Sequence, residues 1–219
     1  MRFLLIHTAG AEGSVALAEG GMVIAAEMLP GRTSSERLVP AVRRLLEENE
    51  QRLRDMTAIV VVHGPGSFTG VRVGLSAAKG LSEASGVRLI GVSRLALLAS
   101  LANEASESVY AVLDAGRGEY YFGEYAGRRC VGERLLSGEE VAEAVSDGVM
   151  MVCEGKVAEA LAGLHPRIVD EPTAMDALPF GVERAEAHKF DDAGELDANY
   201  LRRTDFEIFA KDKAGSAVG

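Results

Sequence analysis

The pattern of apolar and polar positions divides the chain into short extended segments and longer helical ones. The clearest extended segment is Ala58–Val62, a continuous apolar run rich in β-branched residues, which predicts a strand buried on both faces. Short apolar or alternating runs predict further strands at residues 3–6, 14–18, 22–28, 88–92, 109–114, 119–125 and 149–153. Short turns join the first three of these strands, so the chain is expected to open with a β-meander.

Apolar residues at helical spacing predict helices between these strands. The first helix is expected to begin after a cap at Thr33, Ser34 or Ser35 and to end near Asn49. Further helices are expected over residues 71–85, from a Ser93 cap to 103, from a Ser137 cap to 146, over 155–163, and over 173–188 around Pro179. An acidic, irregular stretch follows at 190–199, and the tail after Ala210 is expected to fray. Strands that alternate with helices indicate an α/β protein.

Two segments of the chain resemble each other. A strand, a polar turn containing His7 and Thr8, and a second strand open the first half. The same arrangement, with Asp114 in the turn, opens the second half. Chance is one explanation, since β-hairpins are common. A duplicated unit is the other.

A glycine-rich stretch, residues 63–74, lies between the buried strand 58–62 and the next helix. Such a loop can bring backbone N–H groups and a helix N-terminus to one spot, which suits an anion. Its candidate contacts are Gly64, Gly66, Ser67 and Thr69. The spacing matches neither a Walker A motif nor the dinucleotide fingerprint, so a purely structural turn is the alternative reading.

Composition limits the possible functions. The formal net charge of −10 makes the chain a poor nucleic-acid binder by itself, because phosphate contacts need Lys and Arg. Cys130 and Cys153 stand far apart outside any CxxC and are expected to be free thiols. We find no stretch apolar enough for a membrane span, and the run 3–6 is too short for a signal peptide, so a cytoplasmic location without membrane contact is expected.

The sequence shows no motif for metal or nucleophilic chemistry. Its four histidines form no helical metal pair, so no metal site is expected. Ser76 lies in a segment that lacks the last glycine of a nucleophile elbow, and it is expected on a helix surface. Neither HEXXH nor a paired acid and base is evident, and no catalytic residue is assigned.

The stretch from Gly64 to Gly74, with Lys79 to Leu81, closely resembles the TsaB (YeaZ) family of bacterial tRNA threonylcarbamoyladenosine biosynthesis. The segment from Leu113 to Tyr121 is the second specific match. Weaker matches are the first hairpin, the Ser34-to-Leu46 helix, and residues 91–95 and 200–202. The likeness covers most of the chain but is loose between about residues 128 and 199.

The resemblance implies an actin-like ATPase (ASKHA, ribonuclease H-like) fold with two related subdomains. We place these at residues 1–101 and 102–210, followed by a flexible tail at 211–219. In such folds a nucleotide lies between the halves, so His7, Thr8 and Asp114 join the glycine-loop residues as candidate phosphate contacts. The family usually has Asp at position 7, where a neutral imidazole would be a poor Mg²⁺ ligand. Asp114 is either a ligand or a turn residue that bonds its own backbone.

By the same resemblance, the chain is expected to be a non-catalytic partner that binds and activates the transferase TsaD, with the ATPase TsaE joining the complex. Contact with tRNA would occur only through the complex, ATP or ADP could act at the level of the complex, and a homodimer could form without TsaD. The rival hypotheses are an active actin-like ATPase or phosphotransferase and, less favoured, a glycoprotease-like peptidase.

The helix after the glycine loop is predicted to carry the partner surface. Its polar residues Arg72, Ser76, Lys79 and Glu83 form one narrow stripe, and the rest of its circumference is apolar or small. Arg72 and Lys79 could meet an acidic surface or phosphate, or simply face solvent. Full burial of the helix is the alternative. The expected interface residues are Gly70, Val71, Val73, Gly74, Leu75, Ala77, Ala78 and Leu81, with Leu38, Val42 and Leu45 of the preceding helix.

Overall fold

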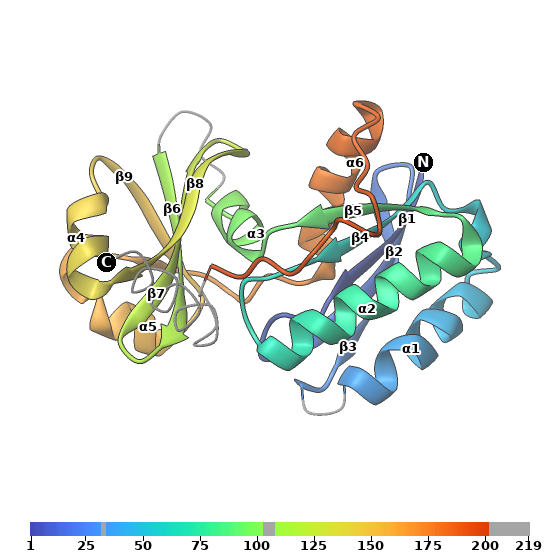
Figure 1. Ribbon diagram of the computed structural model, residues 1–219, viewed down its shortest axis with the longest axis horizontal. Helices are drawn as coiled ribbons and strands as arrows, with labels where there is room; N and C mark the ends of the chain where they lie inside the picture. The colour runs from blue at the N-terminus through green and yellow to red at the C-terminus, as the bar shows by residue number, and fades with distance from the viewer. Residues whose placement is uncertain (32–33, 103–107, 202–219) are drawn as a thin grey trace, which may run out of the picture.

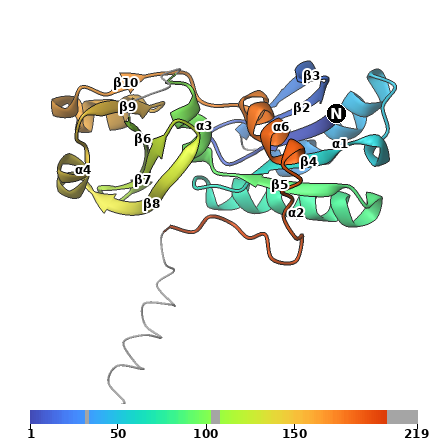
Figure 2. The same ribbon diagram turned by 90° about the horizontal axis from the view of Figure 1, so that it is seen from above.

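The computed structural model describes residues 1–31, 34–102 and 108–201. Two five-stranded sheets lie side by side, each covered by helices (Figures 1 and 2). The predicted cap at Thr33, the matched Arg202 and the predicted tail at 211–219 lie outside the described residues. No described helix is both long and apolar enough to cross a bilayer.

The first sheet has the strand order β3-β2-β1-β4-β5. β1, β2 and β3 form an antiparallel meander, and β4 and β5 add in parallel beside β1. The central strand β4 is buried along its whole length, as its continuous apolar run predicted. The strands are β1 (Arg2–His7), β2 (Gly13–Glu19), β3 (Met22–Leu29), β4 (Ala58–Val62) and β5 (Arg88–Val92).

The second sheet repeats this topology. Its order is β10-β9-β6-β7-β8, with an antiparallel meander β6-β7-β8 and parallel strands β9 and β10. The strands are β6 (Ser108–Gly116), β7 (Glu119–Ala126), β8 (Arg129–Ser137), β9 (Gly148–Val152) and β10 (Arg167–Ile168). The suspected duplication and the actin-like fold with two related subdomains are therefore confirmed.

The helices follow the predicted order with shifted ends. The α-helices are α1 (Ser34–Glu48), α2 (Phe68–Ser85), α3 (Arg94–Ser100), α4 (Gly138–Ala144), α5 (Gly155–Ala160) and α6 (Leu178–Glu186). Single 3₁₀ turns are η2 (Leu53–Asp55), η3 (Ala162–Leu164) and η4 (Ala174–Ala177). The predicted helix 173–188 is therefore η4 followed by α6.

Side-chain caps set several of these helix starts. α2 begins three residues before the predicted position, because the Ser67 Oγ accepts a hydrogen bond from the Gly70 N–H at 3.2 Å. The predicted caps at Ser93 and Ser137 are confirmed. Ser137 forms a full capping box with Glu140. The local sequence was therefore a reliable guide to where these helices start.

The predicted boundary at residue 101 falls between the two sheets, but helices on each side of it pack into the core of the other sheet. α3 precedes this boundary, yet Leu95, Leu98 and Ala99 pack into the core of the second sheet. η4 and α6 follow the boundary, yet Ala177 and Leu178 pack into the core of the first sheet. Each half thus sends its last helix toward the other half's sheet, which only the tertiary packing reveals.

The segment after α6 returns between the halves and runs beside α2 (Figures 1 and 2). Near its start, the Asp191 carboxylate accepts from the Gly91 N–H at 2.7 Å. Near its end, the Asn199 N–H donates to the His63 carbonyl at 2.8 Å, and its side-chain amide donates to Glu133 at 2.5 Å. His63 follows β4 and Glu133 lies in β8, so this acidic, irregular stretch ties the two halves together.

Candidate functional site

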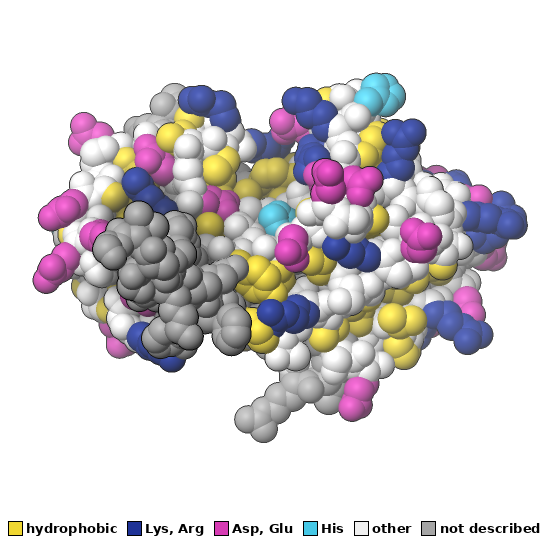
Figure 3. All heavy atoms as spheres, in the orientation of Figure 1, with side chains coloured by type: hydrophobic (Ala, Val, Ile, Leu, Met, Phe, Trp, Pro, Cys, Tyr) yellow, Lys and Arg dark blue, Asp and Glu magenta, His cyan; other side chains and the backbone are white. Residues whose placement is uncertain are grey.

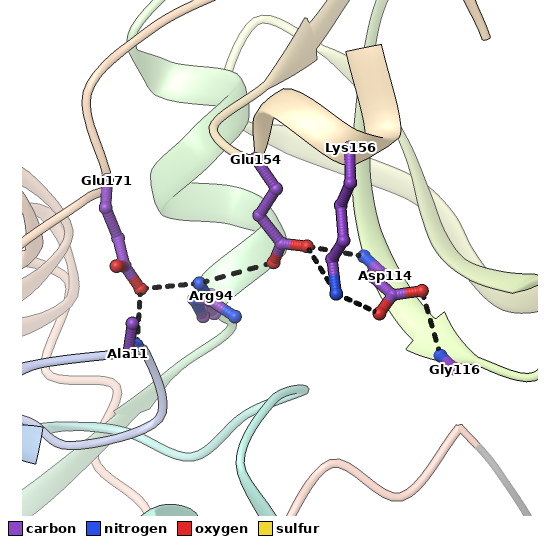
Figure 4. Close-up of polar contacts among 7 residues, drawn as sticks. All are labelled: Ala11, Arg94, Asp114, Gly116, Glu154, Lys156 and Glu171. Atoms are coloured by element: carbon purple, nitrogen blue, oxygen red, sulfur yellow. Dashed lines mark hydrogen bonds and ion pairs between the residues drawn. The ribbon is translucent and has the colours of Figure 1, made fainter. Parts of the chain in front are cut away.

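A cleft of about 370 Å³ lies between the halves. It is bounded on one side by the β1–β2 turn and the glycine loop, and on the other by the end of β6 and the start of α5 (Figure 4). Its lining residues are Ala9, Gly10, Ala11, Gly66, Ser67, Arg94, Asp114, Glu154, Lys156 and Glu171.

The glycine loop forms one wall of the cleft, as the sequence suggested. Gly64 has φ +105°, a conformation that favours glycine, and its carbonyl accepts from the Arg94 N–H at 2.7 Å. The Ser67 N–H donates to the Ala9 carbonyl at 2.9 Å, which holds the loop against the β1–β2 turn. Of the predicted phosphate contacts in this loop, Gly66 and Ser67 line the cleft, whereas Gly64 is buried behind it and Thr69 is exposed on α2.

Arg94 is the central charge of the cleft, and sequence reasoning did not single it out. Its side chain is buried, yet its guanidinium lies 2.6 Å from Glu171 Oε1 and 3.9 Å from Glu154 Oε1. Glu171 Oε1 also accepts from the Ala11 N–H at 2.9 Å (Figure 4). Burial raises the pKa of Glu154, and Arg94 opposes that rise. The one sequence signal was a lone charge at the start of an otherwise apolar helix.

Asp114 lies opposite, at the end of β6, and makes two kinds of contact. Its Oδ1 accepts from the Gly116 N–H at 3.0 Å, which is the local backbone bond of a turn residue. Its Oδ2 lies 2.5 Å from Lys156 Nζ, which is also 4.0 Å from Glu154 (Figure 4). The carboxylate of Asp114 therefore faces the cleft as part of an ion-pair network.

His7 and Thr8 lie behind the cleft wall. The His7 ring is 0% exposed, and neither nitrogen has a hydrogen-bond partner among the described residues. Burial, helped by the nearby Arg94 charge, lowers the pKa of His7 to about 3. The Thr8 hydroxyl donates to the Gly70 carbonyl at 2.7 Å. Neither His7 nor Thr8 lines the cleft, so the structure does not support them as direct phosphate contacts.

Both cations of the cleft are paired with carboxylates of the same chain, and one carboxylate is in excess. Its lining carries the cations Arg94 and Lys156 against the carboxylates Asp114, Glu154 and Glu171. Each cation is within ion-pair distance of at least one carboxylate. A nucleotide phosphate would therefore compete with fixed carboxylates for both cations, which disfavours the phosphotransferase reading. Among the described residues, no group of three potential ligands could hold a metal ion.

The predicted interface residues divide into two groups. The side chains of one group are buried and cannot present a surface: Leu38, Val42, Leu45, Val71, Leu75 and Ala78. All but Val71 lie in the core between α1, α2 and the first sheet, and Val71 lies in the core that η4 and α6 share with that sheet. Gly74 belongs with them, because a Cβ there would overlap the Thr8 hydroxyl. These positions correct the prediction. They form the apolar stripe by which α1 and α2 bind their own sheet.

The second group lies on the flank of α2 and is half-buried: Gly70, Val73, Ala77 and Leu81. Gly70 is also required internally, because a Cβ there would overlap the Thr8 carbonyl. Gly80 on the outer side of α2 is exposed, and a Cβ there would meet nothing within 4 Å. Hydrophobic side chains stand among charged ones over this region (Figure 3).

An aromatic cluster lies where α2 begins. Phe68 is 61% exposed, and the Arg72 guanidinium lies 3.1 Å from its ring centroid. Tyr200, also exposed, lies 6.3 Å from Phe68 between ring centroids. The cluster joins the start of α2 to the segment after α6, and it was not predicted. Arg72 is thus neither a cleft residue nor a plain solvent charge.

The fold and the cleft define the class of protein. A family model described as "TsaD: tRNA N6-adenosine threonylcarbamoyltransferase" matches residues 25–181. The chain belongs to this family of actin-like proteins, and within it to the TsaB (YeaZ) group. YeaZ from Pseudomonas aeruginosa superimposes with a TM-score of 0.79 at 31% identity, over 91% of this chain and 99% of that one.

Curated relatives agree on the group. The chain is 40% identical over 127 residues to the tRNA threonylcarbamoyladenosine biosynthesis protein TsaB of Escherichia coli, covering 57% of this chain and 55% of the relative. It is 32% identical over 142 residues to the protein of the same name from Bacillus subtilis, covering 64% and 62%. These matches thus span between half and two thirds of the relatives' length.

Proposed function

We propose that this chain is a partner subunit in the synthesis of threonylcarbamoyladenosine on tRNA, and that it binds and activates a TsaD-type transferase. The observation that carries the proposal is membership of the TsaB group over almost the whole length of a YeaZ structure. The cleft supports a non-catalytic role, because its cations are engaged by the chain's own carboxylates. The ATPase TsaE, a homodimer in the absence of TsaD, and ATP or ADP in the complex belong to the same proposal.

The partner surface is the outer flank of α2 beside α1. Val73, Ala77 and Leu81 are only half-buried against α1 and the sheet. Gly80 leaves open space above the helix, and on α1 the side chain of Val39 is 51% exposed. Small side chains let a second helix approach closely, since interaxial distance depends on the residues at the contact. A helical surface of the transferase is the expected counterpart.

The test uses two neighbouring alanines that the structure places differently. Ala77 is half-buried on the flank, whereas Ala78 is 0% exposed in the core. Ala77→Glu should leave the circular dichroism spectrum unchanged, abolish co-purification with TsaD and yield a monomer. Ala78→Glu should unfold the chain, because it would bury an unpaired charge.

Ser76→Glu provides a control, because Ser76 is exposed on the polar side of the same helix. It should fold and still co-purify with TsaD. If Ala77→Glu assembles as the unmodified chain does, the partner surface is not on this flank. If both alanine variants unfold, the flank is core rather than interface.

The rival functions have separate tests. Steady-state ATP hydrolysis with Mg²⁺ should be absent in the isolated chain, and turnover that vanished on Asp114→Ala would establish the phosphotransferase instead. Titration of tRNA at physiological salt should show tight binding only after TsaD is added, because the chain carries a net charge of −10. Tight binding by the chain alone would contradict the proposal.

A further inference from the structure

The Glu171 carboxylate lies in the cleft between two hydrogen-bond donors of the kind that bind anions. One of its carboxylate oxygens, Oε1, contacts both the Arg94 guanidinium at 2.6 Å and the Ala11 N–H at 2.9 Å. A buried guanidinium and a backbone amide of a tight turn are the donors that commonly hold phosphate or carboxylate groups in proteins. Glu171 comes from the connection between β10 and η4 and so reaches this spot from far along the chain (Figure 4).

The residues around the Glu171 carboxylate leave room for it and have a donor available. A Cβ at Gly10 would overlap Glu171 Oε1, so a larger residue would close the space that the carboxylate occupies. Arg94 is only 5% exposed, and its Nε, unlike its terminal nitrogen, has no hydrogen-bond partner among the described residues. A buried guanidinium whose donors are not all used needs an acceptor beside it, and Glu171 is the carboxylate that supplies one here.

The cleft is large enough for more than the Glu171 carboxylate. The cleft has a volume of about 370 Å³ and is lined by both Arg94 and Lys156. The Lys156 side chain is exposed to solvent. Glu154 lies between the two cations, at 3.9 and 4.0 Å. A small anion would contact both the Arg94 guanidinium and the Ala11 N–H only by replacing the Glu171 carboxylate, which already accepts from both.

We propose that the cleft contains a small-anion site, formed by Arg94 and the Ala11 N–H, that the chain's own Glu171 fills. Phosphate or a small carboxylate binds there only when the Glu171 side chain is absent or displaced. Glu171 is thus an intramolecular ligand that keeps the cleft closed to anions. This proposal does not depend on the partner role, since it concerns the isolated chain.

The experiment is chemical rescue of Glu171→Ala. The substitution removes the Cγ and carboxylate of the side chain, the atoms of an acetate group, and leaves Arg94 and the Ala11 N–H without their acceptor. We expect the variant to melt at a lower temperature than the unmodified chain, and added acetate or phosphate to raise its melting temperature to a plateau. The rise should be about 3 °C or more at ten times the dissociation constant. The acetate and phosphate arms show which anion fits better.

Three controls complete the test. Sodium chloride at matched ionic strength corrects for screening. Glu159→Ala removes an exposed carboxylate of α5 and should show no anion response. Glu171→Gln keeps the side chain in place and should show no rescue, because the site remains filled.

The unmodified chain gives a result that does not depend on any variant's folding. Its Ala11 amide resonance in a ¹⁵N-correlated NMR spectrum should not move when phosphate is added. A saturable shift of that resonance would overturn the proposal, since the site would then be open. Absence of any rescue in folded Glu171→Ala would overturn it as well.

Discussion

The two halves share one topology but differ in their helices and in the residue near the end of their first strand. In the first half, α1 and α2 have 15 and 18 residues, whereas α4 and α5 of the second half have 7 and 6. The first half buries a neutral His7 at the end of β1, and the second half presents Asp114, near the end of β6, to the cleft. The long helices leave a half-buried flank, which we propose as the partner surface, and the second half supplies most of the charge in the cleft. A repeated fold therefore does not repeat its chemistry.

The largest expected effect is a loss of stability when the buried face of α1 is truncated. Leu38→Ala should destabilise the chain by about 2 to 5 kcal/mol, because it removes a buried side chain and leaves a cavity. Val39→Ala, at an exposed position of the same helix, should change stability by less than about 0.5 kcal/mol. Urea unfolding measures both. Equal effects would show that Leu38 belongs to a surface.

The second prediction concerns His7, the buried histidine at the end of β1. The pKa of His7 is about 3 in the folded chain and has its ordinary value, 6.5, when unfolded, so the unfolded state binds more protons between these values. Stability should fall as pH drops below about 6.5, by roughly 1.4 kcal/mol per pH unit, or about 2 to 3 kcal/mol at pH 4.5.

His7→Phe should remove this contribution to the pH dependence, because it keeps an aromatic ring but cannot take up a proton. His165→Gln, at an exposed position, serves as the control and should retain the slope of the unmodified chain. The free energy of unfolding in urea from pH 7 to 4.5 measures each protein. An unchanged slope in His7→Phe would show that His7 is not the group responsible.

A third prediction compares equivalent helices of the two halves. Gly74→Ala in α2 should cost about 1 to 3 kcal/mol, because the new methyl group would overlap the Thr8 hydroxyl. Gly155→Ala in α5 places its methyl in open space and should change stability by less than about 0.5 kcal/mol. Thermal unfolding distinguishes them. A harmless Gly74→Ala would mean that α2 is not held closely against the β1–β2 turn.

The smallest expected effect concerns the outer side of α2. Gly80→Ala should stabilise the isolated chain by about 0.5 to 1 kcal/mol, because glycine is a poor helix former and the space is open. If the flank binds TsaD, the same substitution should weaken that binding, which isothermal titration calorimetry would detect. A gain in stability with unchanged binding would place the partner elsewhere.

Local sequence was enough to predict the continuously apolar strands, the caps at Ser93 and Ser137, and the duplicated hairpins. These features depend on residues close together in the chain. The sequence did not predict β8 and β10, because neither has a clear local apolar pattern. β8 is an edge strand without a buried position, and β10 is a two-residue strand defined only by its pairing with β9.

The apolar residues of α1 and α2 that belong to the core could be identified only from the packing of these helices on the first sheet. Periodicity shows that a helix has an apolar face but not what covers it, so Leu38 and Leu75 could be taken for interface. The ion pair in the cleft also depends on tertiary packing, between residues that are far apart in the sequence. Arg94 and Glu171 are 77 residues apart and meet only because the last helix of each half crosses to the other sheet. No local pattern encodes that pairing, since its geometry comes from how the two sheets pack.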